Sequence, residues 1–193
     1  MSFVNSRTVV WAVLFIPLAV LCWQYVTGTL FYGEFIHITG EFSARLLILT
    51  LAVTPLRRLL PKQRWTAWFV RQRRYLGIAT FAYAVPHLVA YVIRLRDDIP
   101  RIVSEGLGPE MLTGWVAMVI LLALAVTSNE RSVRKLGRRW KALHRLVYAA
   151  AILTFLHWIL VAFDPIPALV HAGVLVAIEM TRLIRRPVKK QGA

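Results

Sequence analysis

The stretch LHRLVYAAAILTFLHWILVAF at residues 143–163 is long and apolar enough to cross a bilayer as a helix, and it carries a histidine within that span. Apolar segments of this kind recur along the chain, at 9–26, 42–60, 75–95, 111–127, 143–163 and 166–184. Because a segment in lipid must satisfy its own backbone hydrogen bonds, we expect helices, and the alternation typical of a β-barrel is absent. The sequence therefore predicts an all-α integral membrane bundle of about six transmembrane helices.

The overall composition supports a membrane setting. Hydrophobic residues make up 58% of the 193 positions, and the net charge is +15, from 24 Lys and Arg against 9 Asp and Glu. Such a positive excess is compatible with nucleic-acid binding or with a membrane, and the apolar segments favour the membrane. We therefore expect lipid as a partner and no nucleic acid. Cys22 is the one cysteine of the sequence, which excludes an intrachain disulfide and a thiolate metal cluster.

The charged residues between the segments predict the topology. Cationic residues gather at 57–74, at 131–141 and in the tail from Arg182 to Lys190, whereas most acidic residues lie in the other connections. Loops rich in Lys and Arg stay in the cytoplasm, so these regions and both termini are predicted to be cytoplasmic. The basic segments also attract anionic lipid headgroups, and a docking surface for a soluble electron donor is the alternative interpretation.

Two of the five histidines lie deep in predicted helices. His87 and His157 are about 18 Å and 21 Å above the cytoplasmic ends of two helices that run in the same direction. An imidazole at this depth is costly unless it is paired, so each is a functional candidate. One imidazole on each face of a porphyrin would occupy both axial positions of the iron, and such iron transfers electrons without binding oxygen. The pair predicts a bis-histidine heme site.

Other interpretations of the histidines remain open. His87 and His157 are also compatible with hydrogen bonds to Ser, Thr or Tyr of neighbouring helices. A zinc site is weaker, because it needs four ligands and no Cys or acidic residue is expected near that level. His37, expected in an outer loop, and His171, near the outer start of the last segment, are predicted to be structural or solvated.

His144 lies at the cytoplasmic end of its segment, about 20 Å below His157. The residue that would face it from the third segment is Arg74, and arginine is not an iron ligand. The thirteen residues between the two histidines turn an ideal helix by about 1300°, so they do not share one straight face. The spacing leaves a second heme and an ordinary helix-end histidine both open.

Three stretches carry a resemblance to a known family: HITGEFSARLLILTLAVTPLRR at 37–58, RRYLGIATFAYAVPHLVAY at 73–91 and LALAVTSNERSVRKLGRRWKALHRLVYAAAILTFLH at 122–157. The chain resembles the MsrQ or YedZ family, the heme-binding membrane subunits of the periplasmic protein-methionine-sulfoxide reductase system, within the ferric-reductase-like transmembrane group. The most specific part is the series TS, LG, W, LH, VY and H from Thr127 to His157. Pro86 departs from the family, which more usually has leucine there, and predicts a kink one turn below His87.

The resemblance implies a single ferric-reductase-like heme-binding transmembrane domain over residues 1–193, in a bacterial inner membrane. It implies one or two b-type hemes, with His87 and His157 as the outer pair and His144 as a third heme-associated histidine. If a second heme lies at His144, we expect Arg74 or Arg73 to pair with one of its propionates. FMN is a candidate second cofactor. A cytosolic flavin reductase or reduced flavin would donate electrons, and a periplasmic molybdopterin reductase subunit would accept them. The chain would be an electron-transfer subunit rather than the catalytic subunit.

Three competing functions are considered for the same residues. A self-sufficient ferric or oxygen reductase carries its own flavin and nicotinamide domains, and the residues after Ile184 are too few for one. A heme-free permease or scaffold would use the buried histidines as proton relays. A related electron carrier with another acceptor is a third alternative.

Overall fold

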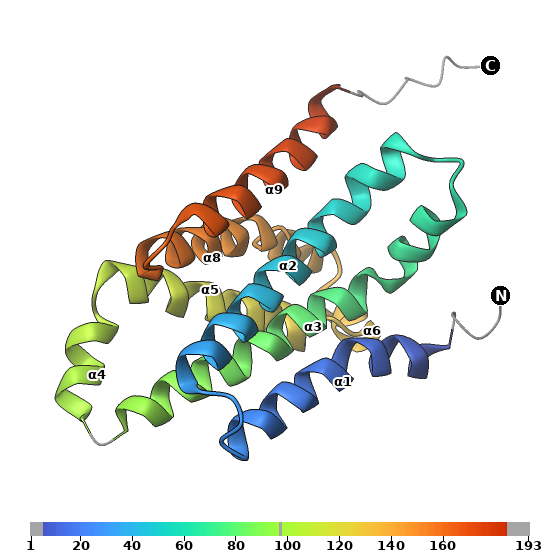
Figure 1. The fold of residues 1–193 in the computed structure, drawn as a ribbon. Coiled ribbons are helices and arrows are strands. Elements are labelled where there is room, and N and C mark those ends of the chain that lie inside the picture. The colour runs from blue at the N-terminus through green and yellow to red at the C-terminus, as the bar shows by residue number, and fades with distance from the viewer. Residues whose placement is uncertain (1–5, 97, 185–193) are drawn as a thin grey trace, which may run out of the picture.

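The computed structural model describes residues 6–96 and 98–184, and these ranges form nine helices and no strand (Figure 1). The helices are α1 (Arg7–Val26), α2 (Tyr32–Leu59), α3 (Arg64–Leu95), α4 (Ile99–Gly106), α5 (Pro109–Val126), α6 (Glu130–Leu136), α7 (Arg138–His144), α8 (Val147–Val161) and α9 (Ile166–Ile184). Asp97 and the tail cations Arg185, Arg186, Lys189 and Lys190, which the topology prediction used, lie outside the described residues.

Within the described chain, α1, α2, α3, α5 and the stretch formed by α7 and α8 are long and apolar enough to cross a membrane. The remaining predicted segment forms α9, which packs against α2 and α8. The expectation of an all-α membrane bundle is confirmed.

Helix α2 is the central element of the bundle. It packs along α3 on one side and against α9 on another, and Figure 1 shows it crossing the middle of the molecule. Leu47 and Leu51 of α2 are almost completely buried, in a cluster that includes Ala150 and Phe155 of α8. A second cluster joins α2 and α3 to α1 through Leu18. This central position lets α2 face the interior of the bundle along much of its length.

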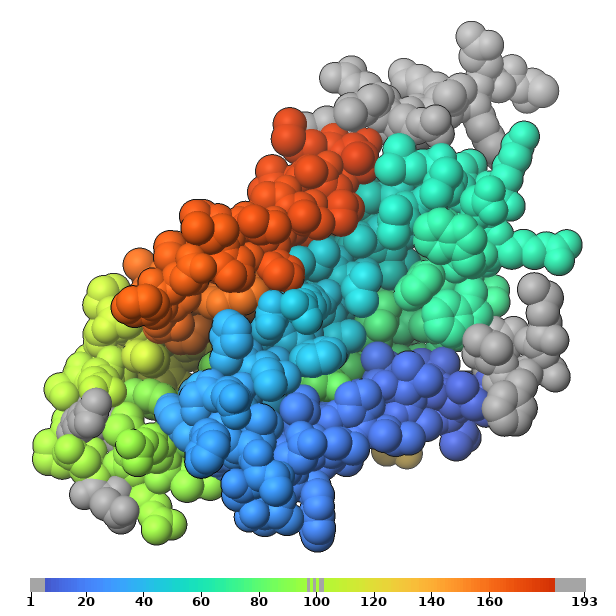
Figure 2. All heavy atoms as spheres, in the orientation of Figure 1, coloured from blue at the N-terminus to red at the C-terminus, as the bar shows by residue number. Residues whose placement is uncertain are grey.

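The outward faces of the helices are apolar. Val13 of α1, Val119 of α5 and Ile152 of α8 are 65 to 69% exposed. Figure 2 shows α9, α2 and α1 side by side along one face of the molecule. Large apolar side chains at this exposure are expected where lipid covers the protein, since lipid tails leave no hydrophobic reason to bury them.

Inside the bundle, short polar side chains bond to the backbone of neighbouring helices. The Ser43 hydroxyl of α2 donates to the Thr80 carbonyl of α3 at 2.9 Å. The Tyr83 hydroxyl of α3 donates to the Leu14 carbonyl of α1 at 3.1 Å. Such bonds satisfy polar groups where water is absent, and they fix the lateral order of the three helices.

Two helices begin well before the predicted segments. Helix α2 begins at Tyr32 rather than near Phe42, and α3 begins at Arg64 rather than near Tyr75. With 28 and 32 residues they extend over about 42 Å and 48 Å, longer than the roughly 30 Å of hydrocarbon. Hydropathy marks the lipid-crossing part of a helix and misses polar turns beyond it. The predicted loop at 57–74 is therefore mostly helical.

One smaller expectation also changes. The basic region at 131–141 forms the short helices α6 and α7, separated by Gly137 with a φ of 52°, a backbone conformation that favours glycine. Helix α3 continues through Pro86 as one helix, and the kink expected there stays a prediction.

The connections gather at two ends of the bundle (Figure 1). The α2–α3 turn, the helices α6 and α7, the start of α1 and the end of α9 lie at one end, which we call the basic end. The α1–α2 turn, α4 and the α8–α9 turn lie at the opposite end. The cationic regions are thus on one side of the bundle, as the charge pattern requires.

We expect the basic end to be cytoplasmic, because cationic segments resist translocation. Single cysteines would be introduced at exposed positions by Lys62→Cys and Arg134→Cys, in a Cys22→Ser background. Phe163→Cys, at a fully exposed position of the opposite end, is the control. An impermeant maleimide should label only the control in intact cells, and all three after the membrane is opened. The reverse pattern in intact cells would invert the topology.

Candidate functional site

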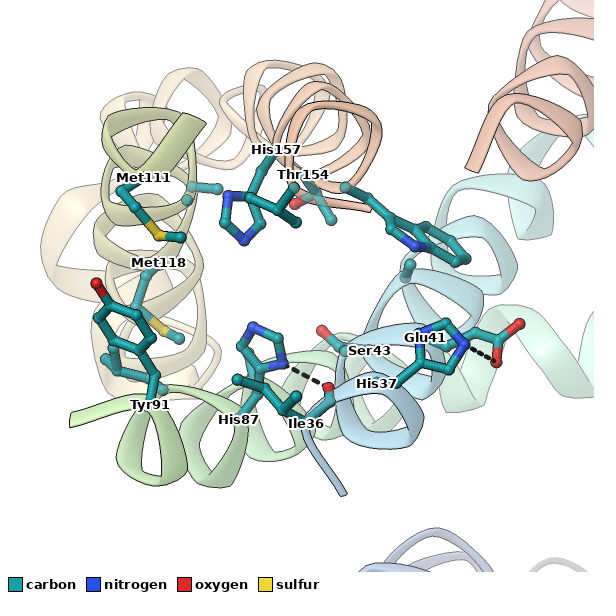
Figure 3. Close-up of a pocket in the computed structure, with 18 of the residues that line it drawn as sticks. Ile36, His37, Glu41, Ser43, His87, Tyr91, Met111, Met118, Thr154 and His157 are labelled. Atoms are coloured by element: carbon teal, nitrogen blue, oxygen red, sulfur yellow. Dashed lines mark hydrogen bonds and ion pairs between the residues drawn. The ribbon is translucent and has the colours of Figure 1, made fainter. Parts of the chain in front are cut away.

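A cavity of about 440 Å³ lies between α2, α3, α5 and α8, toward the opposite end of the bundle (Figure 3). Much of its wall is apolar, including Leu88 of α3 and Met111, Met118 and Leu121 of α5. A cavity of this volume with few polar groups is typical of a cofactor or ligand site. Those few polar groups therefore decide its chemistry.

His87 of α3 and His157 of α8 point into this cavity from opposite walls (Figure 3). Their ring centres are 6.4 Å apart, and the ring planes are nearly perpendicular at 83°. The sequence expectation that the two imidazoles meet at one depth agrees with this arrangement. The space between the rings is part of the cavity.

Each of the two rings is held by its Nδ1 atom. His87 Nδ1–H donates to the Ile36 carbonyl of α2 at 2.8 Å, and His157 Nδ1–H donates to the Glu110 carbonyl of α5 at 2.7 Å. A carbonyl oxygen only accepts, so both Nδ1 atoms carry the proton and both Nε2 atoms keep a lone pair. Neither Nε2 has a hydrogen-bond partner among the described residues. Both Nε2 atoms are therefore able to bind a metal.

The separation of the rings fits one metal ion between them. A bond of about 2 Å from each Nε2 to a shared metal puts the ring centres about 6 to 6.5 Å apart, because each ring centre lies roughly 1 Å behind its nitrogen. The observed 6.4 Å agrees. No group of three or more His, Cys, Asp or Glu able to hold a metal occurs among the described residues. Two imidazoles alone suit a metal whose other ligands come from a macrocycle such as porphyrin, and the apolar walls suit its faces.

The cavity also contains a carboxylate that the sequence analysis did not expect at this level. Glu41 lines the cavity beside His37 on α2, and its Oε2 is 4.0 Å from His37 Nε2. His37 thus belongs to a helix rather than to an outer loop. The predicted helix began ten residues too late, which placed His37 in a loop and left Glu41 out of the helix. The side chain of His37 is 59% exposed, as expected for a solvated residue.

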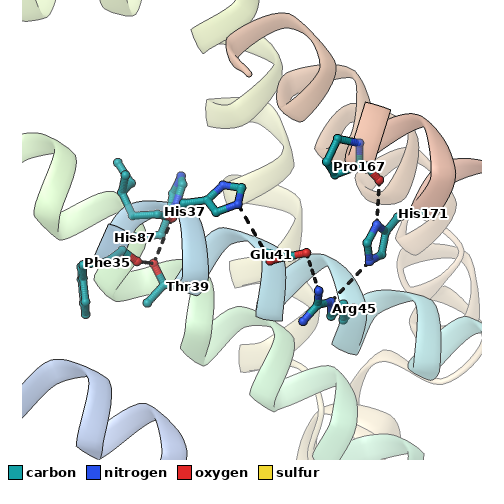
Figure 4. Close-up of polar contacts among 9 residues, drawn as sticks. Phe35, His37, Thr39, Glu41, Arg45, His87, Pro167 and His171 are labelled. Atoms are coloured by element: carbon teal, nitrogen blue, oxygen red, sulfur yellow. Dashed lines mark hydrogen bonds and ion pairs between the residues drawn. The ribbon is translucent and has the colours of Figure 1, made fainter. Parts of the chain in front are cut away.

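A chain of polar contacts continues from Glu41 across to α9 (Figure 4). Glu41 pairs with Arg45 one turn along α2. Arg45 Nε–H donates to His171 Nε2 at 3.3 Å, and His171 Nδ1–H donates to the Pro167 carbonyl at 2.7 Å. Both nitrogens of His171 are therefore engaged, and it is a structural residue as expected. The ion pair lies near the midpoint of α2, where an unpaired charge would be costly.

Comparison with known proteins places the chain in a family. Residues 39–156 match the ferric reductase like transmembrane component. The chain belongs to the ferric-reductase-like transmembrane family. The matched segment contains His87 and His144 and ends one residue before His157.

Curated relatives of this family member match it over most of its length. It is 36% identical to a protein of Xanthomonas campestris pv. campestris over 197 residues, which cover 96% of this chain and 88% of the relative. It is 40% identical to a protein of Brucella anthropi over 154 residues, which cover 78% of this chain and 68% of the relative. Each of these relatives is named protein-methionine-sulfoxide reductase heme-binding subunit MsrQ.

His144 is separate from the cavity of this ferric-reductase-like chain. It ends α7, and its ring stacks on Trp140 with centres 4.0 Å apart. The Thr127 hydroxyl donates to the Ala123 carbonyl at 2.6 Å, so the 3.0 Å contact with His144 is a bond that Nε2–H of the imidazole donates. In this arrangement Nε2 of His144 is not a free ligand, in contrast to Nε2 of His87 and His157.

The arginines expected near His144 lie at the same end of the bundle. Arg74 is an exposed residue of α3, and its half-buried neighbour Arg73 donates to the Thr54 hydroxyl at 3.2 Å. Both arginines act electrostatically on His144. The structure therefore brings Arg73, Arg74 and His144 into one cationic neighbourhood and keeps them away from the pair in the cavity.

The hydrogen bond between Arg45 and His171 should help hold α9 on the bundle. Interhelical hydrogen bonds in membrane proteins contribute about 0.6 kcal/mol on average and up to about 1.7 kcal/mol. We expect His171→Phe, which keeps an aromatic ring beside Trp158, to reduce the free energy of unfolding within that range. Unfolding in mixed detergent micelles measures it, with Ile166→Ala as an exposed control on the same helix. Equal stability of His171→Phe and the wild type would contradict the tether.

Proposed function

We propose that this chain holds a b-type heme between His87 and His157 and carries electrons across the bacterial inner membrane. The observation that carries the proposal is the pair of unprotonated Nε2 atoms on opposite walls of one apolar cavity, with ring centres 6.4 Å apart. The naming of similar proteins as heme-binding subunits supports it.

A heme iron with two imidazole ligands supplies reversible one-electron transfer and has no open position for oxygen. The chain's own residues provide the conditions for this chemistry. His87 and His157 would hold the iron, and the carbonyls of Ile36 and Glu110 fix the ring orientation and increase the basicity of each imidazole. The apolar residues of α5 that line the cavity would exclude water from a bound heme.

We further propose that electrons pass from the basic end to the opposite end. The cationic surface of the α2–α3 turn and α6–α7 suits an anionic donor, such as reduced flavin or the acidic face of a cytosolic flavin reductase. The names of the relatives support a protein-methionine-sulfoxide reductase as the acceptor, and we propose a periplasmic molybdopterin subunit in that role. FMN remains a candidate second cofactor at the donor side.

Loss of either proposed ligand should remove the heme. We expect His87→Ala and His157→Ala each to lower heme content roughly tenfold or more, because an axial bond is lost where even the loss of a supporting contact costs 10 to 100-fold in metal affinity. His171→Ala should keep a wild-type low-spin spectrum, since both of its nitrogens are engaged elsewhere. Heme per chain and the reduced-minus-oxidised spectrum provide the measurement.

The outcome separates the rival functions. A wild-type protein without heme, purified after expression with adequate heme supply, would favour a heme-free permease or scaffold. If both ligand variants kept the wild-type spectrum and potential, the proposed pair would be wrong even though the protein binds heme.

The rate of heme reduction tests whether His144 has a redox role. The resemblance associates His144 with a heme, and we expect Arg74 or Arg73 beside a propionate of that heme. The bond between His144 and Thr127 instead suits an ordinary helix-end residue. In stopped-flow experiments with reduced flavin, the His144→Ala protein should keep the spectrum of the outer heme between His87 and His157. If His144 holds a relay heme, the reduction of the outer heme should slow at least tenfold, because the donor side is roughly 20 Å away. An unchanged rate together with unchanged heme content would leave His144 without a redox role.

Reoxidation in the same assay identifies the acceptor. Reduced protein should be reoxidised by the molybdopterin reductase only when methionine sulfoxide is supplied. Reoxidation by a ferric chelate alone would instead favour a carrier with another acceptor.

A further inference from the structure

His87 and His157 are held by the same local arrangement on two different neighbouring helices. On α2, the carbonyl of Ile36 accepts the His87 bond and Gly40 lies four residues further on. On α5, the carbonyl of Glu110 accepts the His157 bond and Gly114 lies four residues further on. A carbonyl has two lone pairs, so it accepts from the imidazole as well as from the helix amide four residues later. Each imidazole therefore lies across one turn of its neighbouring helix.

The glycines leave room for the rings. A Cβ at position 40 would lie 2.9 Å from His87 Nδ1 and 3.0 Å from Cε1. A Cβ at position 114 would lie 2.8 Å from His157 Nδ1 and 2.9 Å from Cε1. These separations are well inside van der Waals contact, so a methyl group at either position would displace the ring or the helix.

The rings have little freedom to move away. The nearest ring atom in both cases is Nδ1, the atom that is bonded to the backbone of the same helix, so a ring that moves away from a methyl group must lengthen that bond. On the α2–α3 side, the bond from Ser43 to the Thr80 carbonyl opposes separation of the two helices. A methyl group at either glycine would therefore displace the imidazole, and with it the Nε2 atom.

We propose that Gly40 and Gly114 are positioning residues that set the two axial imidazoles for one iron, which rests on the proposed heme function. Each glycine allows the ring close enough to its helix to bond the carbonyl, and that bond fixes the tautomer with Nε2 facing the cavity. The two helix pairs, α2 with α3 and α5 with α8, each contribute one such unit. The 6.4 Å separation of the rings results from these two close approaches.

Gly77 is the matched control. It lies in the same α2–α3 interface, but a Cβ there would meet only Thr50 Cγ2 at 3.7 Å, an ordinary contact. Gly77→Ala should therefore be tolerated, and alanine favours a helix over glycine. Any general intolerance of this interface to a methyl group would appear in Gly77→Ala as well.

The first test is spectroscopic. Gly40→Ala and Gly114→Ala should each lower heme per chain roughly 10 to 100-fold, the effect of losing a ligand's supporting contacts. The heme that remains should gain high-spin character and bind carbon monoxide when reduced, because one axial bond is weakened. The wild type and Gly77→Ala should stay low-spin and not bind carbon monoxide. Wild-type spectra and potentials in both glycine variants would overturn the proposal.

The second test removes the ring for which Gly40 makes room. In the wild-type background Gly40→Ala should lower the thermal unfolding temperature. In a His87→Ala background the same substitution should leave it unchanged or raise it, because the added methyl group then meets no imidazole. Gly114→Ala with His157→Ala provides the second cycle. A penalty that persists after the ring is removed would identify a general packing role and overturn the proposal.

The unfolding cycles are measured on heme-free protein, so that loss of bound heme does not contribute to the unfolding temperature. If the wild type holds no heme, the proposed function fails, and the cycles still decide whether the glycines position the histidines. If Gly40→Ala does not accumulate, its combination with His87→Ala should accumulate, and failure of that double variant would also count against the proposal.

Discussion

The hydrogen bonds from His87 and His157 to two backbone carbonyls are the constraint on which the site depends. Inside a membrane bundle, a polar imidazole must find a partner, and the carbonyls of Ile36 and Glu110 are available because a helix uses only one lone pair of each. Satisfying Nδ1 in this way leaves Nε2 as the free lone pair on each ring. The hydrogen bond that satisfies Nδ1 inside the bundle thus also leaves Nε2 free to bind a metal.

The charged side chains beside the cavity also need partners inside the bundle. Glu41 lines the cavity at the level of the histidines, and Arg45 pairs with it one turn away. His171 accepts a hydrogen bond from Arg45 at Nε2 and donates one from Nδ1–H to the Pro167 carbonyl of α9. Within the described residues, the charged groups at mid-bundle are therefore compensated, and α9 is attached to α2 by polar contacts that lipid cannot replace. A cofactor in the cavity would experience a neutral pair rather than an isolated carboxylate.

The basic end has a different character from the cavity. His144, Trp140 and Thr127 form a small network there, with Arg73 and Arg74 close enough to act on His144. Its imidazole uses Nε2–H to bond a side chain, whereas the cavity histidines use Nδ1–H to bond the backbone. The two kinds of histidine are thus distinguished by tautomer, which follows from the partner that each finds. The family relationship concerns both regions, since the matched segment runs from one to the other.

Sequence patterns alone predict the all-α membrane class, the gathering of cations at one end and the matched depth of His87 and His157. These properties follow from hydropathy, charge and helical rise, which are local quantities. Segment edges failed where polar turns extended α2 and α3 beyond the apolar region, and this placed His37 and Glu41 wrongly. Packing between helices sets the carbonyl partners of the two ligands, the close approach of Gly40 and Gly114, and the hydrogen bond between His144 and Thr127. Each of these depends on how one helix is rotated and translated against another, because side-chain packing across the bundle sets that relation and no single segment encodes it.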